Sequence, residues 1–246
     1  MLTSTLIVIA LTFALAGFVK GVIGLGLPTI SMGLLALVMP TPQAAAVLVV
    51  PSIITNFWQM FDGPALREIT RRLWPMLAGI CIGTWSAAGM MTSAPSSASK
   101  VVLGLCIAGY GLLGLSAVRF HVTPAVERWL AFPVGLATGL LAAGTGVFVI
   151  PSVPYLQALE MGRDRLVQAL AISFTVSTLA LVGNLVYGNV FSLEVAGLSA
   201  FALIPALAGM AIGQFARTRL SEAAFRRVFF VSLVALGTYI AWRAVG

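Results

Sequence analysis

The sequence predicts an all-α polytopic membrane protein built from two inverted repeats. Three observations lead to this fold class: the composition, a series of long apolar segments, and two regions of internal similarity. Of the 246 residues, 60% are hydrophobic and 9% are charged, whereas a soluble domain carries about 25% charged residues. At roughly 20 residues per spanning helix, the length suffices for about eight to ten crossings and leaves little for an extramembrane domain.

Apolar segments follow one another along nearly the whole chain. They cover residues 4–24, 27–39, 43–61, 73–91, 101–118, 129–159, 166–187, 193–215 and 225–241. The stretches 15–39 and 129–159 are interrupted by glycine and proline, which predicts broken helices because proline lacks an N–H donor and glycine adopts non-helical angles readily. Each broken region is followed by three uninterrupted segments, so we expect the broken regions to be helical hairpins.

The chain contains an internal repeat. The two broken regions align through their glycines, and residues 74–85 align without gaps with residues 204–215, sharing proline, Leu-Ala-Gly and Ile-Gly at identical spacing. Internal similarity at this scale indicates a duplicated structural unit. We therefore predict an N-terminal transmembrane repeat, residues 1–120, and a C-terminal transmembrane repeat, residues 129–246, within one integral membrane domain.

The charges predict that the repeats have opposite orientations. Arginines gather in the predicted loops 62–72 and 217–227, and arginine-rich loops remain in the cytoplasm. The first loop precedes the Pro-x-Leu-Ala-Gly helix of its repeat, whereas the second follows the matching helix. The loops equivalent to them, 188–192 and 92–99, are uncharged and suit the outer face. Inversion requires an odd number of crossings per repeat, so each broken region must contribute two crossings or a re-entrant hairpin.

The glycine-rich pattern of residues 17–26 (GFVKGVIGLG), repeated as residues 135–146 (GLATGLLAAGTG), is similar to the TauE/SafE sulfite exporter family. The resemblance covers nearly the whole chain, including its length, its number of segments and its two-fold repeat. It implies a multi-pass protein of the bacterial cell inner membrane. It also implies transport of small sulfur-containing anions such as sulfite, a sulfonate or sulfoacetate, with export as the expected direction.

Broken helices near the bilayer midplane predict an anion site between the repeats. Their free backbone N–H groups and the helix dipole attract negative charge. Lys20 lies inside an apolar run, where an ammonium is costly unless it is paired or hydrated, and Asn56 places an amide in a membrane helix. The residues predicted to bind the substrate are Lys20, Gly24, Gly26, Thr29, Ser52, Asn56, Gly144, Thr145, Gly146, Ser173 and Ser177.

Each of these residues also has a structural interpretation. Lys20 can snorkel to the membrane interface, glycines can simply permit close helix packing, and hydroxyl groups can bond their own helix. The seven acidic residues fall at segment ends or in loops, as does His121. We therefore predict no enzyme activity, no cofactor and no metal site.

The predicted partners are a small anionic substrate and the lipid bilayer. The net charge of +7 follows from basic residues beside membrane segments rather than from nucleic-acid binding, and a homo-oligomer stays open. Two alternative functions also stay open. One is transport of another small organic anion or a thiol metabolite, and the other, from a different class, is a membrane subunit or enzyme without transport of its own.

Overall fold

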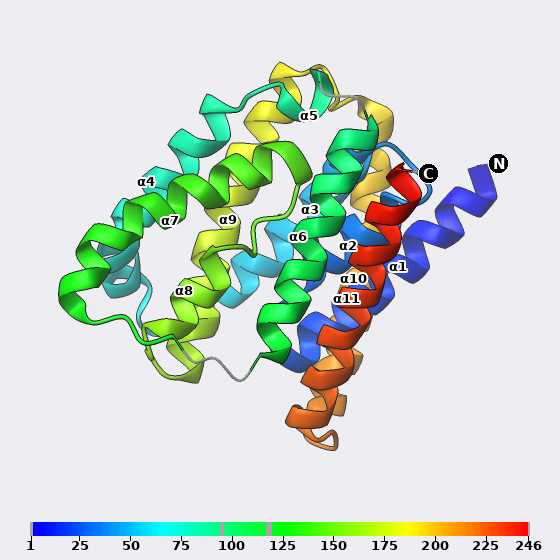
Figure 1. Ribbon diagram of the computed structural model, residues 1–246. Helices are drawn as coiled ribbons and strands as arrows, with labels where there is room; N and C mark the ends of the chain where they lie inside the picture. Colours follow the sequence, from blue (N-terminus) through cyan, green and yellow to red (C-terminus); the bar gives the residue numbers. More distant parts are fainter. Residues whose placement is uncertain (1, 94–95, 117–119, 246) are drawn as a thin grey trace.

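The computed structural model describes residues 2–93, 96–116 and 120–245, which form helices and loops without a β-strand (Figure 1). Eight helices in these ranges are long and apolar enough to cross a membrane, α4 being counted together with α5. They are α1 (Leu2–Ile23), α3 (Thr41–Phe61), α4 (Leu66–Ser86), α6 (Ser96–Leu115), α7 (Pro124–Thr145), α9 (Arg163–Tyr187), α10 (Leu193–Arg217) and α11 (Glu222–Val245). The short helices are α2 (Leu27–Leu35), α5 (Met90–Ser93) and α8 (Ser152–Ala158). The protein is thus an all-helical, multi-pass membrane protein.

Both glycine-rich regions are broken helices. Helix α1 ends before Gly24, whose φ is +81°, and Gly26, with φ of +108°, leads into α2. Helix α7 ends at Gly146, with φ of +71°. Glycine tolerates these positive angles because it has no Cβ. Each region therefore consists of one membrane-length helix followed by a short helix, α2 or α8.

Close helix pairs join the two halves of the sequence. A Cβ on Gly17 of α1 would lie 2.1 Å from the Ala206 carbonyl oxygen of α10, and one on Gly213 would lie 2.1 Å from the Phe18 carbonyl oxygen. Since residue numbers rise together along both helices, α1 and α10 run parallel. Small residues allow this backbone contact.

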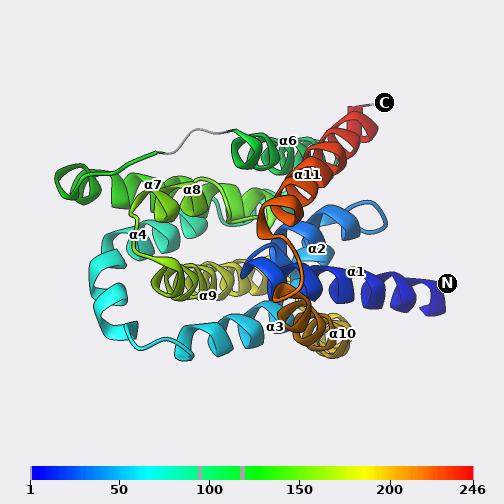
Figure 2. The same ribbon diagram turned by 90° about the horizontal axis from the view of Figure 1, so that it is seen from below.

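A second parallel pair, α4 and α7, has the same construction. A Cβ on Gly135 of α7 would lie 2.0 Å from the Met76 carbonyl oxygen, and one on Gly83 of α4 would lie 2.2 Å from the Leu136 carbonyl oxygen. The third pair, α6 and α11, is antiparallel and meets at Gly104 and Gly237 (Figures 1 and 2). In all three pairs, one helix comes from the first half of the sequence and the other from the second half.

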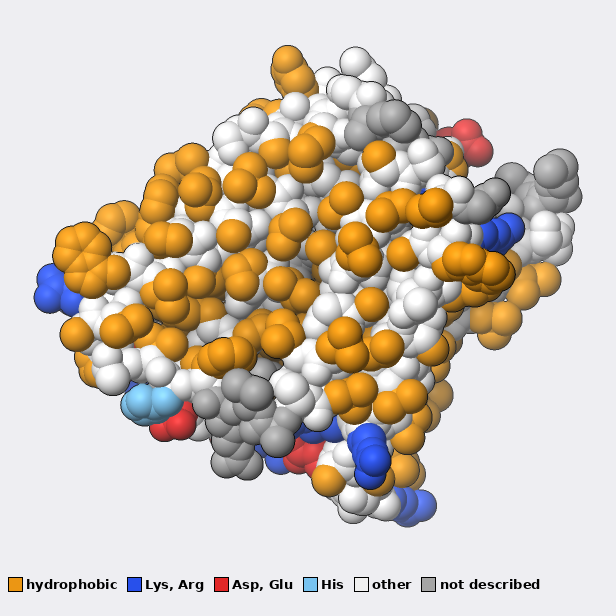
Figure 3. Space-filling model, in the orientation of Figure 1, with side chains coloured by type: hydrophobic (Ala, Val, Ile, Leu, Met, Phe, Trp, Pro, Cys, Tyr) orange, Lys and Arg blue, Asp and Glu red, His pale blue; other side chains and the backbone are white. Residues whose placement is uncertain are grey.

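Charged and apolar surfaces are separated. Hydrophobic side chains cover the face of the molecule drawn in Figure 3, and charged side chains appear mainly around its margin. The ends of α4, α7, α9, α10 and α11 that carry most arginines lie on one side, which we call the arginine face. The prediction of a loop at residues 62–72 is mostly wrong, because α4 begins at Leu66 and includes the three arginines of this stretch. Arginine is a good helix former, so the helix continues beyond the apolar segment.

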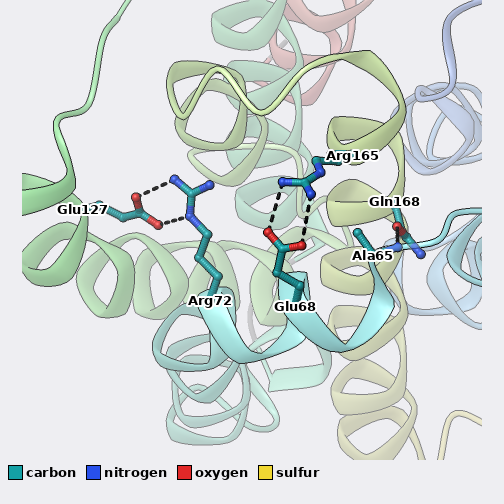
Figure 4. A network of polar contacts seen from close by, with 6 residues as sticks. All are labelled: Ala65, Glu68, Arg72, Glu127, Arg165 and Gln168. Atoms are coloured by element: carbon teal, nitrogen blue, oxygen red, sulfur yellow. Dashed lines mark hydrogen bonds and ion pairs between the residues drawn. The ribbon is translucent and has the colours of Figure 1, made fainter.

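Polar contacts on the arginine face join helices from both halves (Figure 4). Arg72 of α4 donates two hydrogen bonds to Glu127 of α7, at 2.6 and 2.7 Å. Arg165 of α9 donates two to Glu68 of α4, both at 3.0 Å. Buried Gln168 of α9 accepts from the Ala65 backbone N–H at 3.1 Å. It donates to the Met60 carbonyl oxygen in α3 and to the Gly63 carbonyl oxygen in the α3–α4 connection. Bidentate hydrogen bonds between arginine and glutamate fix the relative geometry of the two side chains and also strengthen their attraction.

Candidate functional site

Lys20 lies in the last turn of α1, and its side chain is only 2% exposed. Its ammonium group donates to Thr55 Oγ1 at 2.9 Å and to Asn56 Oδ1, both on α3. Among the described residues, these neutral oxygens are its hydrogen-bond acceptors. Burial of the ammonium contradicts the interpretation of Lys20 as a residue that snorkels to the membrane interface.

A chain of hydrogen bonds continues from Lys20 into the second half. Asn56 donates to Ser52 Oγ at 3.2 Å, and Ser52 Oγ lies 3.0 Å from Thr178 Oγ1 on α9. Thr178 in turn donates to the Phe174 carbonyl oxygen at 2.7 Å. Because Thr178 donates its hydrogen to Phe174, Ser52 is the donor to Thr178, and the chain runs in one direction from the ammonium to the Phe174 carbonyl oxygen.

The third N–H of the Lys20 ammonium has no acceptor among the described residues, since an ammonium carries three donors and two are used. Lys20 also lines a cavity of about 320 Å³. Gly24, Gln59 and Asp62 line the same cavity, as do Arg217 and Arg226 of the arginine face. We call it the Lys20 cavity. The residue that carries the unused donor thus lines a cavity that extends to arginines of the arginine face.

The structure brings together only some of the predicted site residues. Lys20 and Gly24 line the Lys20 cavity. Asn56 accepts a hydrogen bond from the ammonium, and Ser52 accepts one from Asn56. Gly26 does not line it and instead packs near Val19 and Phe229.

The remaining predicted residues lie away from the Lys20 cavity lining. Gly144 lies against Met90, and Gly146 lies against Met32 and Ala45 of the first half. Thr145 donates to the Leu141 carbonyl oxygen of its own helix. Thr29, Ser173 and Ser177 are buried, and their hydroxyl groups have no hydrogen-bond partner among the described residues.

Sequence reasoning left several residues out of the predicted set. Thr55 and Thr178 belong to the hydrogen-bond chain, although membrane hydroxyls usually bond only their own helix. Their spacing is a usable signal, because Thr55 adjoins Asn56 and lies one turn from Ser52. Arg217 and Arg226 had been interpreted only as markers of orientation, yet both line the Lys20 cavity.

Comparison with known proteins identifies the family. No curated protein and no solved structure matches the chain. A family model described as Sulfite exporter TauE/SafE matches residues 9–240, nearly the full length. This agrees with the resemblance carried by the two glycine-rich regions, and the family is one of transporters. The chain therefore belongs to the TauE/SafE sulfite exporter family.

Proposed function

We propose that the chain is an exporter of small sulfur-containing anions, such as sulfite, a sulfonate or sulfoacetate, in a bacterial inner membrane. In this proposal the anion binds at Lys20, between two inverted repeats. The observation that carries the proposal is Lys20: its ammonium group is buried and bound by neutral oxygens, and the residue lines a cavity.

The electrostatics favour an anion at this position. Burying an ammonium without a counter-charge is costly, and neutral hydrogen-bond acceptors compensate only part of that cost. An oxyanion that accepts the third N–H gains a charge-assisted hydrogen bond, which is about twice as strong as a neutral one. The cavity lining has four basic residues, Lys20, Arg163, Arg217 and Arg226, and three acidic ones, Asp62, Asp164 and Glu222. Its net formal charge, 4 − 3 = +1, also favours an anion.

The helix pairs support the inverted-repeat part of the proposal. Helix α1 begins the first repeat and packs parallel to α10 of the second, while α7 begins the second repeat and packs parallel to α4 of the first. The glycines at these contacts are four residues apart in every helix, for example Gly17 with Gly21 and Gly79 with Gly83. Reciprocal contacts of this kind are expected for two related units around a two-fold axis.

The two repeats differ at the proposed site. Alignment of the glycine patterns puts Thr138 at the position equivalent to Lys20. Thr138 donates to the Val134 carbonyl oxygen of its own helix at 2.8 Å and contributes no charge. The proposed transporter therefore has one charged binding position, provided by the first repeat, while Thr178 of the second repeat supports it through Ser52.

Cysteine labelling tests the inverted orientation. Single cysteines at the exposed positions Ser97, Asn189 and Ser221 are introduced after Cys81 and Cys106 are replaced. A membrane-impermeant thiol reagent added to intact cells should label the first two positions and spare Ser221, because the positive-inside rule puts the arginine face in the cytoplasm. Labelling of all three in permeabilised cells is the control. Labelling of Ser221 in intact cells would contradict the inverted orientation.

Flux in proteoliposomes tests the transport function. Vesicles are loaded with sulfite, and a potassium diffusion potential is set without a pH or sodium difference. A singly charged anion leaving a negative interior gains about 2.3 kcal/mol per 100 mV. Because the acidic residues of the described helices lie near their ends, we expect efflux to follow the potential without a proton gradient.

The sign of the potential provides the internal control. Efflux should accelerate with a negative interior and slow when the sign is reversed. Flux that ignores voltage but follows an imposed pH difference would mean that a proton is carried. Efflux of acetate with equal speed would favour the broader alternative of a small organic anion. If the protein is folded in the vesicles and no flux of any anion is seen, the alternative of a membrane subunit is favoured.

A further inference from the structure

A second cavity adjoins the Lys20 cavity near the arginine face. It has a volume of about 450 Å³ and is lined by residues of α6, α8 and α11, together with Ser116, Phe120 and Glu160. Gln157, Arg226 and Phe230 line both cavities and form their common wall. A side chain of this wall can therefore contact a solute on either side.

Tyr110 of α6 supplies an unused donor in the second cavity. The residue is 2% exposed, and its hydroxyl group has no hydrogen-bond partner among the described residues. Its ring packs edge-on against Phe230, with 5.5 Å between ring centroids. A buried hydroxyl without a partner costs free energy. This cost is relieved when a ligand in the cavity accepts a hydrogen bond from the hydroxyl group.

Arg226 of α11 supplies the charge. Its guanidinium lies 5.9 Å from the Phe230 ring centroid, and it forms no ion pair within the described ranges of the chain. Glu160 is the one carboxylate among the residues lining this cavity. Its Oε2 lies 3.4 Å from His121 Nδ1. Arg226 therefore retains N–H donors that match the oxygens of an oxyanion.

We propose that Tyr110, Gln157 and Arg226 form a second binding position for an oxyanion, in series with Lys20. The ligand is a compact group with several acceptor oxygens, either the sulfite or sulfonate group of a transported solute or the phosphate of a lipid headgroup. The wall shared with the Lys20 cavity favours the solute, and to that extent the inference rests on the proposed function. The position then holds the anion at the cytoplasmic end of its path, before it reaches Lys20.

Binding of sulfite to the purified protein in neutral detergent provides the first arm of the test. Two classes of binding position are expected. Tyr110→Phe, which removes only the hydroxyl group, and Arg226→Gln should each weaken one class about tenfold or more. Lys20→Met should weaken the other class instead.

Two control variants match these changes. Tyr155→Phe removes another buried hydroxyl without a partner, and Arg227→Gln removes the neighbouring charge on α11, yet neither residue lines the two cavities. Both controls should bind sulfite like the parent protein. Thermal denaturation of all variants separates weakened binding from unfolding.

Retention of phosphatidylglycerol provides the second arm. Protein from nanodiscs that contain this lipid is examined by native mass spectrometry. If Tyr110→Phe and Arg226→Gln reduce the retained lipid but leave sulfite binding unchanged, the occupant of the position is a lipid phosphate.

The outcomes for the two sites are separable. A single class of sulfite position that responds to Lys20→Met, with sulfite and lipid binding unchanged by Tyr110→Phe and Arg226→Gln, would overturn the second position and leave the proposed function standing. A response to Tyr110→Phe and Arg226→Gln without a response to Lys20→Met would support the second position and contradict the site proposed at Lys20.

Discussion

Replacement of Lys20 by methionine is expected to weaken anion binding by roughly tenfold to over a hundredfold, because a charge-assisted hydrogen bond contributes about 1.5 to 3 kcal/mol. Methionine has a similar length but no charge. Asn56→Leu should act in the same direction, since Asn56 accepts a hydrogen bond from the ammonium and links it to Ser52. Equilibrium binding of sulfite, thiosulfate, sulfoacetate, taurine and acetate to each purified variant measures the effect.

The unfolding temperature of Lys20→Met should not fall together with its affinity for sulfite. Removing a buried charge that lacks a charged partner removes a desolvation cost, so Lys20→Met should unfold at the same temperature as the parent or higher. Lys100→Met makes the identical chemical change on α6, outside both cavities, and should preserve binding. Sulfite affinity of Lys20→Met equal to that of the parent would show that this ammonium contacts α3 but does not bind the anion.

Gly209→Ala is expected to destabilise the protein strongly, although alanine normally stabilises a helix relative to glycine by about 1 kcal/mol. A Cβ at residue 209 would lie 2.1 Å from the Ala14 carbonyl oxygen of α1. Backbone atoms cannot rotate away as a side chain can, so α1 and α10 must separate. Overpacking costs typically about 1 to 3 kcal/mol, and the backbone contact puts this site at the upper end.

Gly197→Ala is the matched control because it lies in the same helix and a Cβ there meets no atom within 4 Å. Its stability should equal that of the parent or exceed it. Because Gly209→Ala should lower the stability and Gly197→Ala should not, the comparison distinguishes the effect of helix packing from that of helix propensity. Size-exclusion chromatography after heating, followed by fluorescence, measures the folded fraction. Equal melting of the two variants would contradict the close pairing of α1 with α10.

Much of the fold could be predicted because hydropathy and charge report directly on the bilayer. Eight of the nine apolar segments overlap a long helix, the exception being 27–39 with the short helix α2, and glycine marked the ends of α1 and α7. The start of α4 was missed by seven residues, since apolar segment 73–91 begins after the helix does at Leu66. Hydropathy detects the hydrocarbon core, whereas a helix can continue into the polar headgroup layer.

The candidate site was predictable only in part. Lys20 and Asn56 attract attention because their polarity is expensive in a membrane, but their contact joins positions 36 residues apart. A single sequence does not indicate which residues so far apart in the chain are in contact. Gly17 was ambiguous for a related reason, because packing and anion binding both require the absence of a Cβ. Its contact with Ala206 favours packing.

The pairing of α1 with α10 has a consequence for biogenesis. The glycine surface of α1 packs on a helix that is made much later and begins at Leu193. At about 5 to 20 residues per second, synthesis of the intervening chain takes roughly 10 to 40 seconds. During this interval, α1 resides in the bilayer with lipid or insertion machinery in place of its final neighbour. Chains truncated before α10 would retain that unfinished surface, which offers membrane quality-control proteases a means of recognising incomplete products.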